Sequence, residues 1–175
     1  MKQNIVKAIN KGRILIYPTD TIYGIGTDAT NSKSVKVIRK LKNSKKPFSI
    51  IASKEWIRKN CVLRKEHEKY LRKLPGKYTF IIKLKNKKAI SKEVNYGKDT
   101  IGVRIPKHPF TKYILASKKP FITTSVNITN KKFATNINEI PKKFKKHAII
   151  INAGKLKAKP SKIYDLTQTK ARRIR

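Results

Sequence analysis

Short apolar runs alternate with polar segments along the chain, and the spacing of the apolar positions switches between the helical and the strand period. Apolar residues three and four positions apart predict helices, which the chain delimits with capping residues and Gly12. The helical segments are residues 4–11, a stretch after Asn31 or Ser32 with the stripe Val35, Ile38 and Leu41, a stretch from Ser53 that holds Trp56 and Ile57, and residues 66–74, 109–117 and 136–146. Compact apolar runs predict strands at residues 13–17, 48–52, 78–84, 100–105, 120–124, 148–152, 163–166 and 172–174.

The order of these elements predicts the fold class. Strands and helices are interleaved, but some neighbouring strands have no helix between them. This order is typical of an α/β protein with a twisted, open, mixed sheet and flanking helices. A length of 175 residues fits one domain, residues 1–175, and is enough to bury a core.

The chain has no signal for a membrane or for secretion. No apolar run approaches the ~20 residues of a membrane span, and Met1–Asn4 lacks the start of a signal peptide. The single Cys61 excludes an internal disulfide and a cysteine metal cluster. We therefore expect a soluble, cytoplasmic protein with no membrane partner.

The charge balance is extreme, with 45 Lys and Arg residues against 9 Asp and Glu residues and a formal net charge of +36. Two explanations stay open for this excess. One is a polyanionic partner such as RNA or a nucleotide, and the other is a proteome biased toward Lys, Ile and Asn. The few acids, Asp20 and Asp28 among them, are expected to have local tasks such as capping, a turn hydrogen bond or metal binding.

The most informative segment is residues 17–26, Tyr-Pro-Thr-Asp-Thr-Ile-Tyr-Gly-Ile-Gly, directly after a buried apolar run. Pro18 ends the strand because it has no N–H, and Gly24 and Gly26 allow the backbone to approach a ligand closely. Open α/β sheets bind ligands at the carboxyl ends of their strands. The loop that carries Thr21 is therefore the first candidate for a ligand site.

Three further segments carry candidate chemistry. The basic run 40–47 ends one predicted helix, and its lysines either complement the helix dipole or bind phosphates. Residues 123–127, Thr-Thr-Ser-Val-Asn, offer hydroxyl and amide groups that either bind a polar ligand or cap a turn. Arg104 lies inside a strand between Val103 and Ile105. If its side chain lies on an internal face of the sheet, the guanidinium group needs a partner, for example a ligand carboxylate or phosphate.

Several common kinds of site are excluded. Residues 24–29 formally match a dinucleotide fingerprint, but no helix begins inside the motif, and no Walker-type lysine loop is present. His67, His108 and His147 lack the spacing of metal ligands. The sequence predicts neither a metal held by protein ligands nor a nucleophilic triad.

The ordered set of segments resembles the YrdC/TsaC family, whose members are threonylcarbamoyl-AMP synthases. The matching segments are residues 17–24, the basic run 40–47, residues 74–80 together with 102–109, and residues 124–127. The resemblance covers nearly the whole chain, and residues 160–166 extend it. It implies a YrdC-like fold with a concave, positively charged cleft and no additional C-terminal domain.

The family reaction implied by this resemblance joins L-threonine, bicarbonate or CO2, and ATP with Mg²⁺ into threonylcarbamoyl-AMP and pyrophosphate. A downstream tRNA threonylcarbamoyltransferase would then modify tRNA, so tRNA or double-stranded RNA is an expected partner. Matched to the family motifs, the residues expected to bind threonine are Thr21, Arg104, Thr123 and Ser161. Those expected to bind ATP are Lys42, Lys46, Thr100, Ser125, Asn127 and Arg175. Lys42 and Arg104 are the expected catalytic residues.

One motif departs from the family. The Lys-x-Arg pair of the basic loop is not intact, because one alignment places Lys42-Asn43-Ser44 there and another places Lys40-Leu41-Lys42. Lys42 belongs to both alignments. Loss of the arginine removes bidentate phosphate recognition. Two alternatives therefore stay open: a non-catalytic RNA-binding module on the same fold, and a carbamoyl-adenylate domain of the kind found in hydrogenase maturation.

Overall fold

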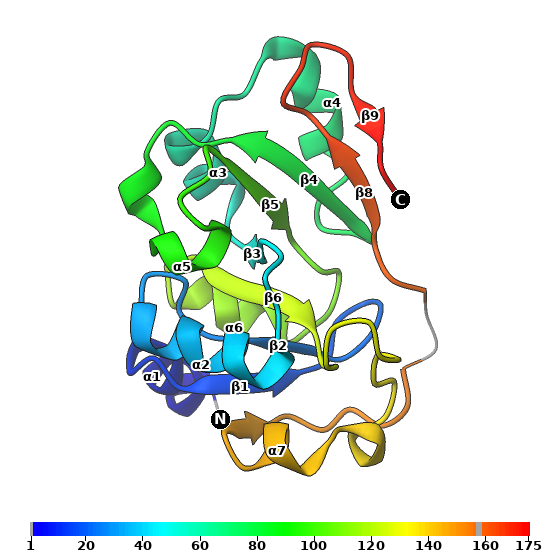
Figure 1. Ribbon diagram of the computed structural model, residues 1–175. Helices are drawn as coiled ribbons and strands as arrows, with labels where there is room; N and C mark the ends of the chain where they lie inside the picture. The colour runs from blue at the N-terminus through cyan, green and yellow to red at the C-terminus, as the bar shows by residue number, and fades with distance from the viewer. Residues whose placement is uncertain (1, 157–158) are drawn as a thin grey trace.

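The computed structural model describes residues 2–156 and 159–175, in which nine strands form one mixed sheet in the order β7-β1-β2-β6-β3-β5-β4-β8-β9 (Figure 1). The strands are β1 (Ile14–Tyr17), β2 (Gly24–Gly26), β3 (Ser49–Ile51), β4 (Tyr78–Lys83), β5 (Thr100–Arg104), β6 (Phe121–Ser125), β7 (Ala148–Ile150), β8 (Lys162–Asp165) and β9 (Arg172–Arg173). The α-helices are α1 (Lys2–Asn10), α2 (Ser32–Lys42), α3 (Lys54–Asn60), α4 (Glu68–Leu71), α5 (Lys92–Asn95), α6 (Thr111–Ala116) and α7 (Lys142–Lys145). Short 3-10 helices are η1 (Lys65–His67), η2 (Lys87–Ala89) and η3 (Ile137–Glu139).

The sheet combines parallel and antiparallel neighbours. The pairs β1–β7, β3–β5 and β4–β8 are parallel, and the other neighbouring strands are antiparallel. Helices flank this open sheet in Figure 1. The predicted α/β fold with an open, mixed sheet and flanking helices is confirmed.

Strand β1 is buried on both faces, which explains its uninterrupted apolar sequence. Ile14 and Ile16 belong to the larger hydrophobic core. Leu15 and Tyr17 belong to a smaller core that α1 and α6 cover. Because successive side chains of a strand point to opposite faces, four apolar residues in a row supply both cores.

Helix α2 forms as its sequence predicts. The side chain of Asn31 accepts a hydrogen bond of 3.1 Å from the backbone N–H of Ser34 and so caps the first turn. The predicted stripe is buried, and it consists of Val35, Ile38 and Leu41. Burial of this stripe sets the rotation of the helix and therefore the direction in which its last residues point.

The helix predicted over residues 136–146 is wrong. The structure has η3 at Ile137–Glu139 and the separate short helix α7 at Lys142–Lys145. Pro141 lies between them, and it disfavours helical backbone in the preceding residue and removes one N–H donor. Ile140 accordingly has extended backbone, with φ −77° and ψ 123°.

Strand β2 was not predicted, because two of its three residues are glycines. It pairs with β1 on one side and with β6 on the other. A Cβ on Gly26 would lie 1.8 Å from the carbonyl oxygen of Ile122, so glycine is required where β2 approaches β6. This strand also confirms that residues 24–29 are not a dinucleotide-binding turn.

The helices of the described part of the chain are all too short or too polar to cross a lipid bilayer.

Candidate active site

A cavity of about 470 Å³ opens where several strands of the sheet begin or end. Thr21 comes from the turn after β1, Arg104 from the end of β5, and Ser125 from the end of β6. Thr79 at the start of β4 lines it as well. Four cations and no carboxylate are among the described residues that line the cavity: Lys42, Lys46, Arg104 and Arg175.

The fold brings most of the predicted site residues together from distant parts of the sequence. Nine of them line this one cavity: Thr21, Lys42, Lys46, Arg104, Thr123, Ser125, Asn127, Ser161 and Arg175. Their shared location is consistent with the predicted roles, and the individual roles stay predictions.

Thr100 is the exception. It begins β5, whereas Arg104 ends it, and four residues of strand span roughly 13 Å. Thr100 therefore lies at the opposite end of the strand and does not line the cavity. The structure gives no support for contact between this residue and a nucleotide bound there.

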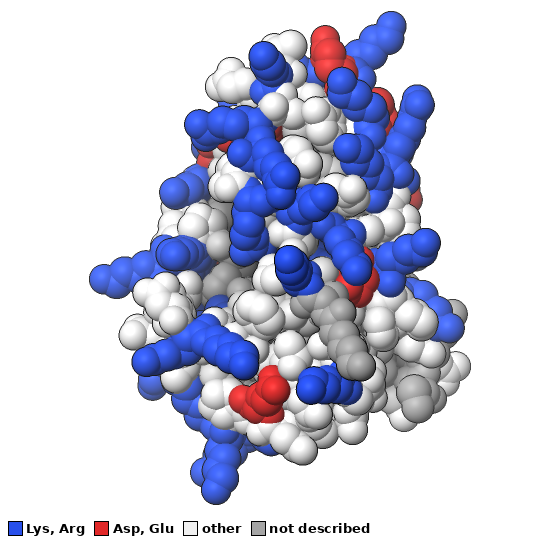
Figure 2. Space-filling model, turned by 90° about the vertical axis from the view of Figure 1, so that its right-hand side faces the viewer, with Lys and Arg blue, Asp and Glu red and all other residues white. Residues whose placement is uncertain are grey.

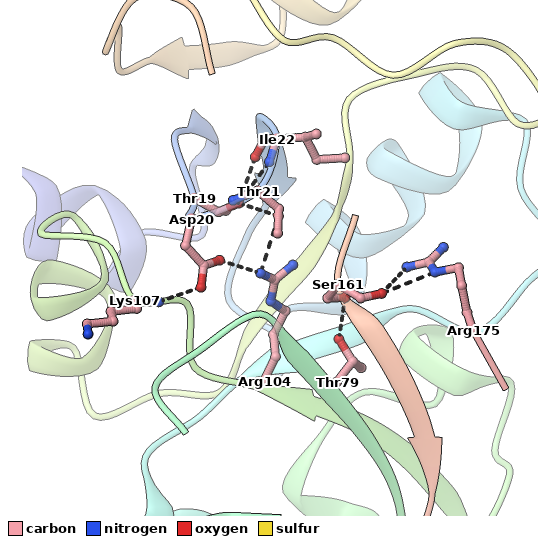
Figure 3. Close-up of polar contacts among 9 residues, drawn as sticks. All are labelled: Thr19, Asp20, Thr21, Ile22, Thr79, Arg104, Lys107, Ser161 and Arg175. Carbon is pink, nitrogen blue, oxygen red and sulfur yellow. Dashed lines mark hydrogen bonds and ion pairs between the residues drawn. The ribbon is translucent and has the colours of Figure 1, made fainter. Parts of the chain in front are cut away.

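The turn after β1 is braced by Thr19, a residue that the sequence analysis did not select. Its hydroxyl accepts hydrogen bonds from the N–H groups of Thr21 (3.1 Å) and Ile22 (3.3 Å) and donates to the carbonyl of Ile22 at 2.7 Å. It also lies 2.9 Å from the hydroxyl of Thr21 (Figure 3). This local network holds the buried Thr21 hydroxyl in the cavity wall.

Arg104 has an internal acidic partner, which the sequence analysis did not foresee. Its Nη2 donates to Asp20 Oδ1 at 2.8 Å, and Asp20 Oδ2 accepts a hydrogen bond of 2.9 Å from the backbone N–H of Lys107 (Figure 3). Nη2 also lies 3.4 Å from the hydroxyl of Thr21. Burial lowers the pKa of Arg104, and Asp20 opposes that shift. The sequence feature that could have indicated this ion pair is Asp20 itself, an acid next to Thr21 in a chain with few acids.

The Nε of Arg104 is buried and has no hydrogen-bond partner among the described residues. Arg104 as a whole is 8% exposed. A buried donor without a partner costs about 1–3 kcal/mol. Arg104 lines the cavity, so its guanidinium group favours a ligand that supplies acceptors. A carboxylate is a suitable acceptor because its oxygens match the geometry of a guanidinium group.

Two residues near the end of the chain complete this wall of the cavity. The hydroxyl of Ser161 lies 2.9 Å from that of Thr79. The Nε and Nη2 of Arg175 donate to the carbonyl of Ser161 at 3.2 and 3.1 Å (Figure 3). The guanidinium group of Arg175 is thus anchored to the segment that leads into β8. It is close enough to Arg104 to lower the pKa of that residue further, which favours an anionic ligand between them.

Lys42 is directed at the loop after β6. Its Nζ donates to the carbonyls of Ser125 and Asn127 and, at 3.0 Å, to Asn127 Oδ1. These contacts use all three N–H donors of the ammonium group. Burial lowers the pKa of Lys42 to about 8. Lys42 therefore holds the shape of the loop, whereas the exposed Lys46 lines the cavity with no described partner for its Nζ.

Comparison with known proteins identifies the family of this chain. A family model named for Sua5, YciO and YrdC, and described as telomere recombination, matches residues 7–175. The chain belongs to the Sua5/YciO/YrdC family. A member from Methanocaldococcus jannaschii, provisionally named a threonylcarbamoyl-AMP synthase, is 39% identical over 175 residues that cover 97% of this chain and 82% of that protein. The threonylcarbamoyl-AMP synthase of Vibrio campbellii is 28% identical over 173 residues, covering 93% of this chain and 92% of that protein.

A solved structure of the Sua5/YciO/YrdC family extends the comparison to three dimensions. The crystal structure of Pyrococcus abyssi Sua5 complexed with L-threonine superposes with a TM-score of 0.87 at 27% identity. The similarity covers 100% of this chain and 54% of that one, so the chain spans about half the length of that Sua5.

Proposed function

We propose that this chain is a threonylcarbamoyl-AMP synthase, which forms threonylcarbamoyl-AMP and pyrophosphate from L-threonine, bicarbonate or CO2, and ATP. The observation that carries the proposal is the buried guanidinium group of Arg104 beside Thr21, in a cavity lined by four cations. The names of the relatives and the threonine in the Sua5 crystal structure support it.

The amino acid would bind at the Arg104 end of the cavity. The guanidinium group of Arg104 would donate to the threonine carboxylate, with Asp20 holding its Nη2. The hydroxyls of Thr21, Thr123 and Ser161 would form the polar wall around the remaining groups of threonine.

The nucleotide would bind toward the loop after β6. Lys46 and Arg175 would face the phosphates, and Ser125 and Asn127 would supply neutral polar groups. The contacts of Lys42 with that loop support a positioning role, with charge stabilisation of the phosphates as its second contribution.

The chemistry requires positioning more than a protein nucleophile. The threonine nitrogen forms a bond to the carbon of CO2 and loses a proton, which leaves a carbamate. A carbamate oxygen then attacks the α-phosphorus of ATP, and the bond from that phosphorus to the bridging oxygen breaks to release pyrophosphate. A cavity of fixed cations lowers the barrier by holding the reactants close and stabilising the negative charge that moves to the leaving group.

Mg²⁺ would enter with ATP, where it offsets phosphate charge. The described residues contain no group of three or more His, Cys, Asp or Glu side chains arranged to hold a metal ion. The carbonyl oxygens of Ser125 and Asn127 already contact the ammonium group of Lys42, so the phosphates of ATP would supply most of the ligands of the ion.

The product would serve tRNA modification in the cytoplasm, where a tRNA threonylcarbamoyltransferase would transfer the group to tRNA. Figure 2 shows a face on which lysines and arginines far outnumber acids, and such a surface attracts RNA. The same surface supports the second candidate, a non-catalytic RNA-binding module. The altered Lys-x-Arg pair favours that candidate, and the Arg104 site favours the enzyme.

One assay separates the two candidates. The protein is incubated with ATP, Mg²⁺, bicarbonate and threonine, and pyrophosphate release is measured with and without threonine. The enzyme gives threonine-dependent release that also requires bicarbonate. Retained binding of double-stranded RNA with no threonine-dependent release would contradict the synthase and leave the RNA-binding module.

A further inference from the structure

The basic loop between α2 and β3, residues 43–47, is held by an arginine that lies outside it. Ser44, Lys46 and Pro47 of this loop line the cavity, and Ser44 belongs to one of the two alignments of the family's altered Lys-x-Arg pair. Arg39, one helical turn before Lys42, is only 8% exposed and does not line the cavity.

The guanidinium group of Arg39 connects the loop to α5. Its Nη1 donates to the carbonyls of Ser44 at 3.1 Å and Lys46 at 3.0 Å. Its Nη2 donates to the carbonyl of Val94 at 2.9 Å, and its Nε donates to the carbonyl of Glu93. One planar group therefore holds the backbone of the basic loop and the backbone of α5 together.

Two aromatic rings hold the same group in place. The guanidinium carbon lies 4.3 Å from the ring centroid of Phe48 and 3.9 Å from that of Tyr96. The hydroxyl of Tyr96 lies 3.0 Å from Arg39 Nη1 and donates to the Ser44 carbonyl at 3.1 Å. Cation–π contacts of this kind are strongest where the cation is removed from water. Tyr96 is itself 47% exposed, so it covers the cluster from the solvent side.

The contacts of Arg39 decide what it can do for a ligand. Each of its three guanidinium nitrogens donates to a backbone carbonyl or a phenol, and Arg39 does not line the cavity, so it is not placed to bind a phosphate there. It acts on the loop, and the loop carries Lys46, whose backbone carbonyl is one of the groups that Arg39 holds. An exposed lysine on an unrestrained loop would lose more side-chain and backbone entropy when it binds a phosphate.

We propose that Arg39 is a positioning residue, which fixes the basic loop so that Ser44 and Lys46 face the nucleotide end of the cavity and which thereby sets the affinity for ATP. This inference rests on the proposed function. The altered Lys-x-Arg loop is, on this view, made rigid by an arginine on the preceding helix and by Tyr96, the residue that follows α5.

The test compares binding of Mg·ATP and of L-threonine, each titrated separately by calorimetry, to the wild-type protein and to two variants. Arg39→Lys keeps the charge but loses the planar set of donors, and Tyr96→Leu removes one ring without touching the core. We expect roughly tenfold weaker ATP binding for Arg39→Lys and a smaller loss for Tyr96→Leu, with threonine affinity within about twofold of wild type. Arg58→Lys is the matched control, because Arg58 is half-exposed and pairs with Glu68 on α4.

Each outcome has a defined meaning. An unchanged ATP affinity in Arg39→Lys, or equal losses of ATP and threonine affinity, would overturn the positioning role. If Arg39→Lys does not fold, Tyr96→Leu decides by the same two affinities. A wild-type protein that binds neither ligand would overturn the proposed function together with this inference. A wild-type protein with threonine-dependent turnover and an unaffected variant would overturn the inference alone.

Discussion

Arg104 and Lys42 are both buried cations of the cavity wall, but their partners differ. Arg104 is neutralised by Asp20, which holds Nη2 of a guanidinium group that lines the cavity. Lys42 is surrounded by neutral oxygens that use all of its donors. Arg104 is therefore suited to bind an anionic ligand, whereas Lys42 fixes the loop after β6.

Substitution of Arg104 tests the amino-acid end of the cavity. Arg104→Ala should weaken threonine binding by roughly tenfold or more and ATP binding far less, because a charge-assisted hydrogen bond is lost. Asp20→Asn should give a smaller loss in the same direction, since the guanidinium group is then held less firmly. Isothermal titration measures both affinities. Asp28→Asn is the control, because that buried acid pairs with Lys119 away from the cavity. An unchanged threonine affinity in Arg104→Ala would show that Arg104 does not bind threonine.

The pKa of Lys42 predicts a pH dependence of stability. Burial lowers this pKa from 10.5 to about 8, so between these values the unfolded chain binds more protons than the folded protein. The contribution of Lys42 to the free energy of unfolding therefore rises with pH across this window. It is complete above 10.5 and lost as the pH falls through 8.

Lys42→Met should lack this contribution. The free energy of unfolding of the wild type, minus that of the variant, should increase from pH 8 toward pH 10.5 in urea titrations. The exposed Lys40 gives the matched variant Lys40→Met, for which the difference should stay constant. A constant difference for Lys42→Met as well would contradict the buried, depressed pKa.

At the scale of secondary structure, the cavity depends on the close approach of β2 to β6. Gly24 of β2 pairs with Ser125 of β6, so this contact places the end of β6 next to the turn that carries Thr21. Gly26 lies in the same strand where the carbonyl of Ile122 leaves no room for a side chain.

Gly26→Ala should therefore destabilise the protein strongly. The new Cβ would lie 1.8 Å from the carbonyl oxygen of Ile122, and moving a backbone atom of a central strand should cost about 3 kcal/mol. Gly24→Ala is the control in the same strand, since its Cβ would lie 3.1 Å from the ring of Tyr17. Urea denaturation should give a clearly larger loss for Gly26→Ala, and equal losses would contradict the packing argument.

The helices and strands also show which features a local sequence pattern can predict. Helix α2 was predicted with its cap and its buried stripe because both signals are local. The prediction of one helix over residues 136–146 was wrong because it followed the period of the apolar positions and neglected Pro141, which interrupts the helix. Strand β2 was missed because two of its three residues are glycines, and Gly26 is required by β6, a strand 95 or more residues away that no local pattern records.

At the scale of the whole molecule, the net charge of +36 gives a field that acts on any polyanion. Figure 2 shows that lysines and arginines gather on the face near β8 and β9 in the view of Figure 1. Because each neutralised phosphate releases counterions, binding to RNA should depend steeply on salt.

Fluorescence anisotropy with labelled tRNA measures this dependence. Affinity should fall by roughly 10³-fold between about 50 and 200 mM KCl if at least six phosphates are contacted. An uncharged polymer of similar length serves as the control and should not bind. A flat salt dependence would show that the lysine excess does not form an RNA-binding surface.

The residues that gather at the cavity were selected largely through the resemblance to a known family. Local sequence signals were sufficient for the fold class and for most strands. These features follow from apolar period, turn residues and ordered motifs, which act over short distances along the chain. Only the tertiary structure identified the pairing of Asp20 with Arg104, the position of Thr100 outside the cavity, and the contacts of Lys42 and Arg39. Each of these depends on contacts between residues far apart in the sequence, or on which end of a strand faces a ligand, and such contacts are fixed when the sheet assembles.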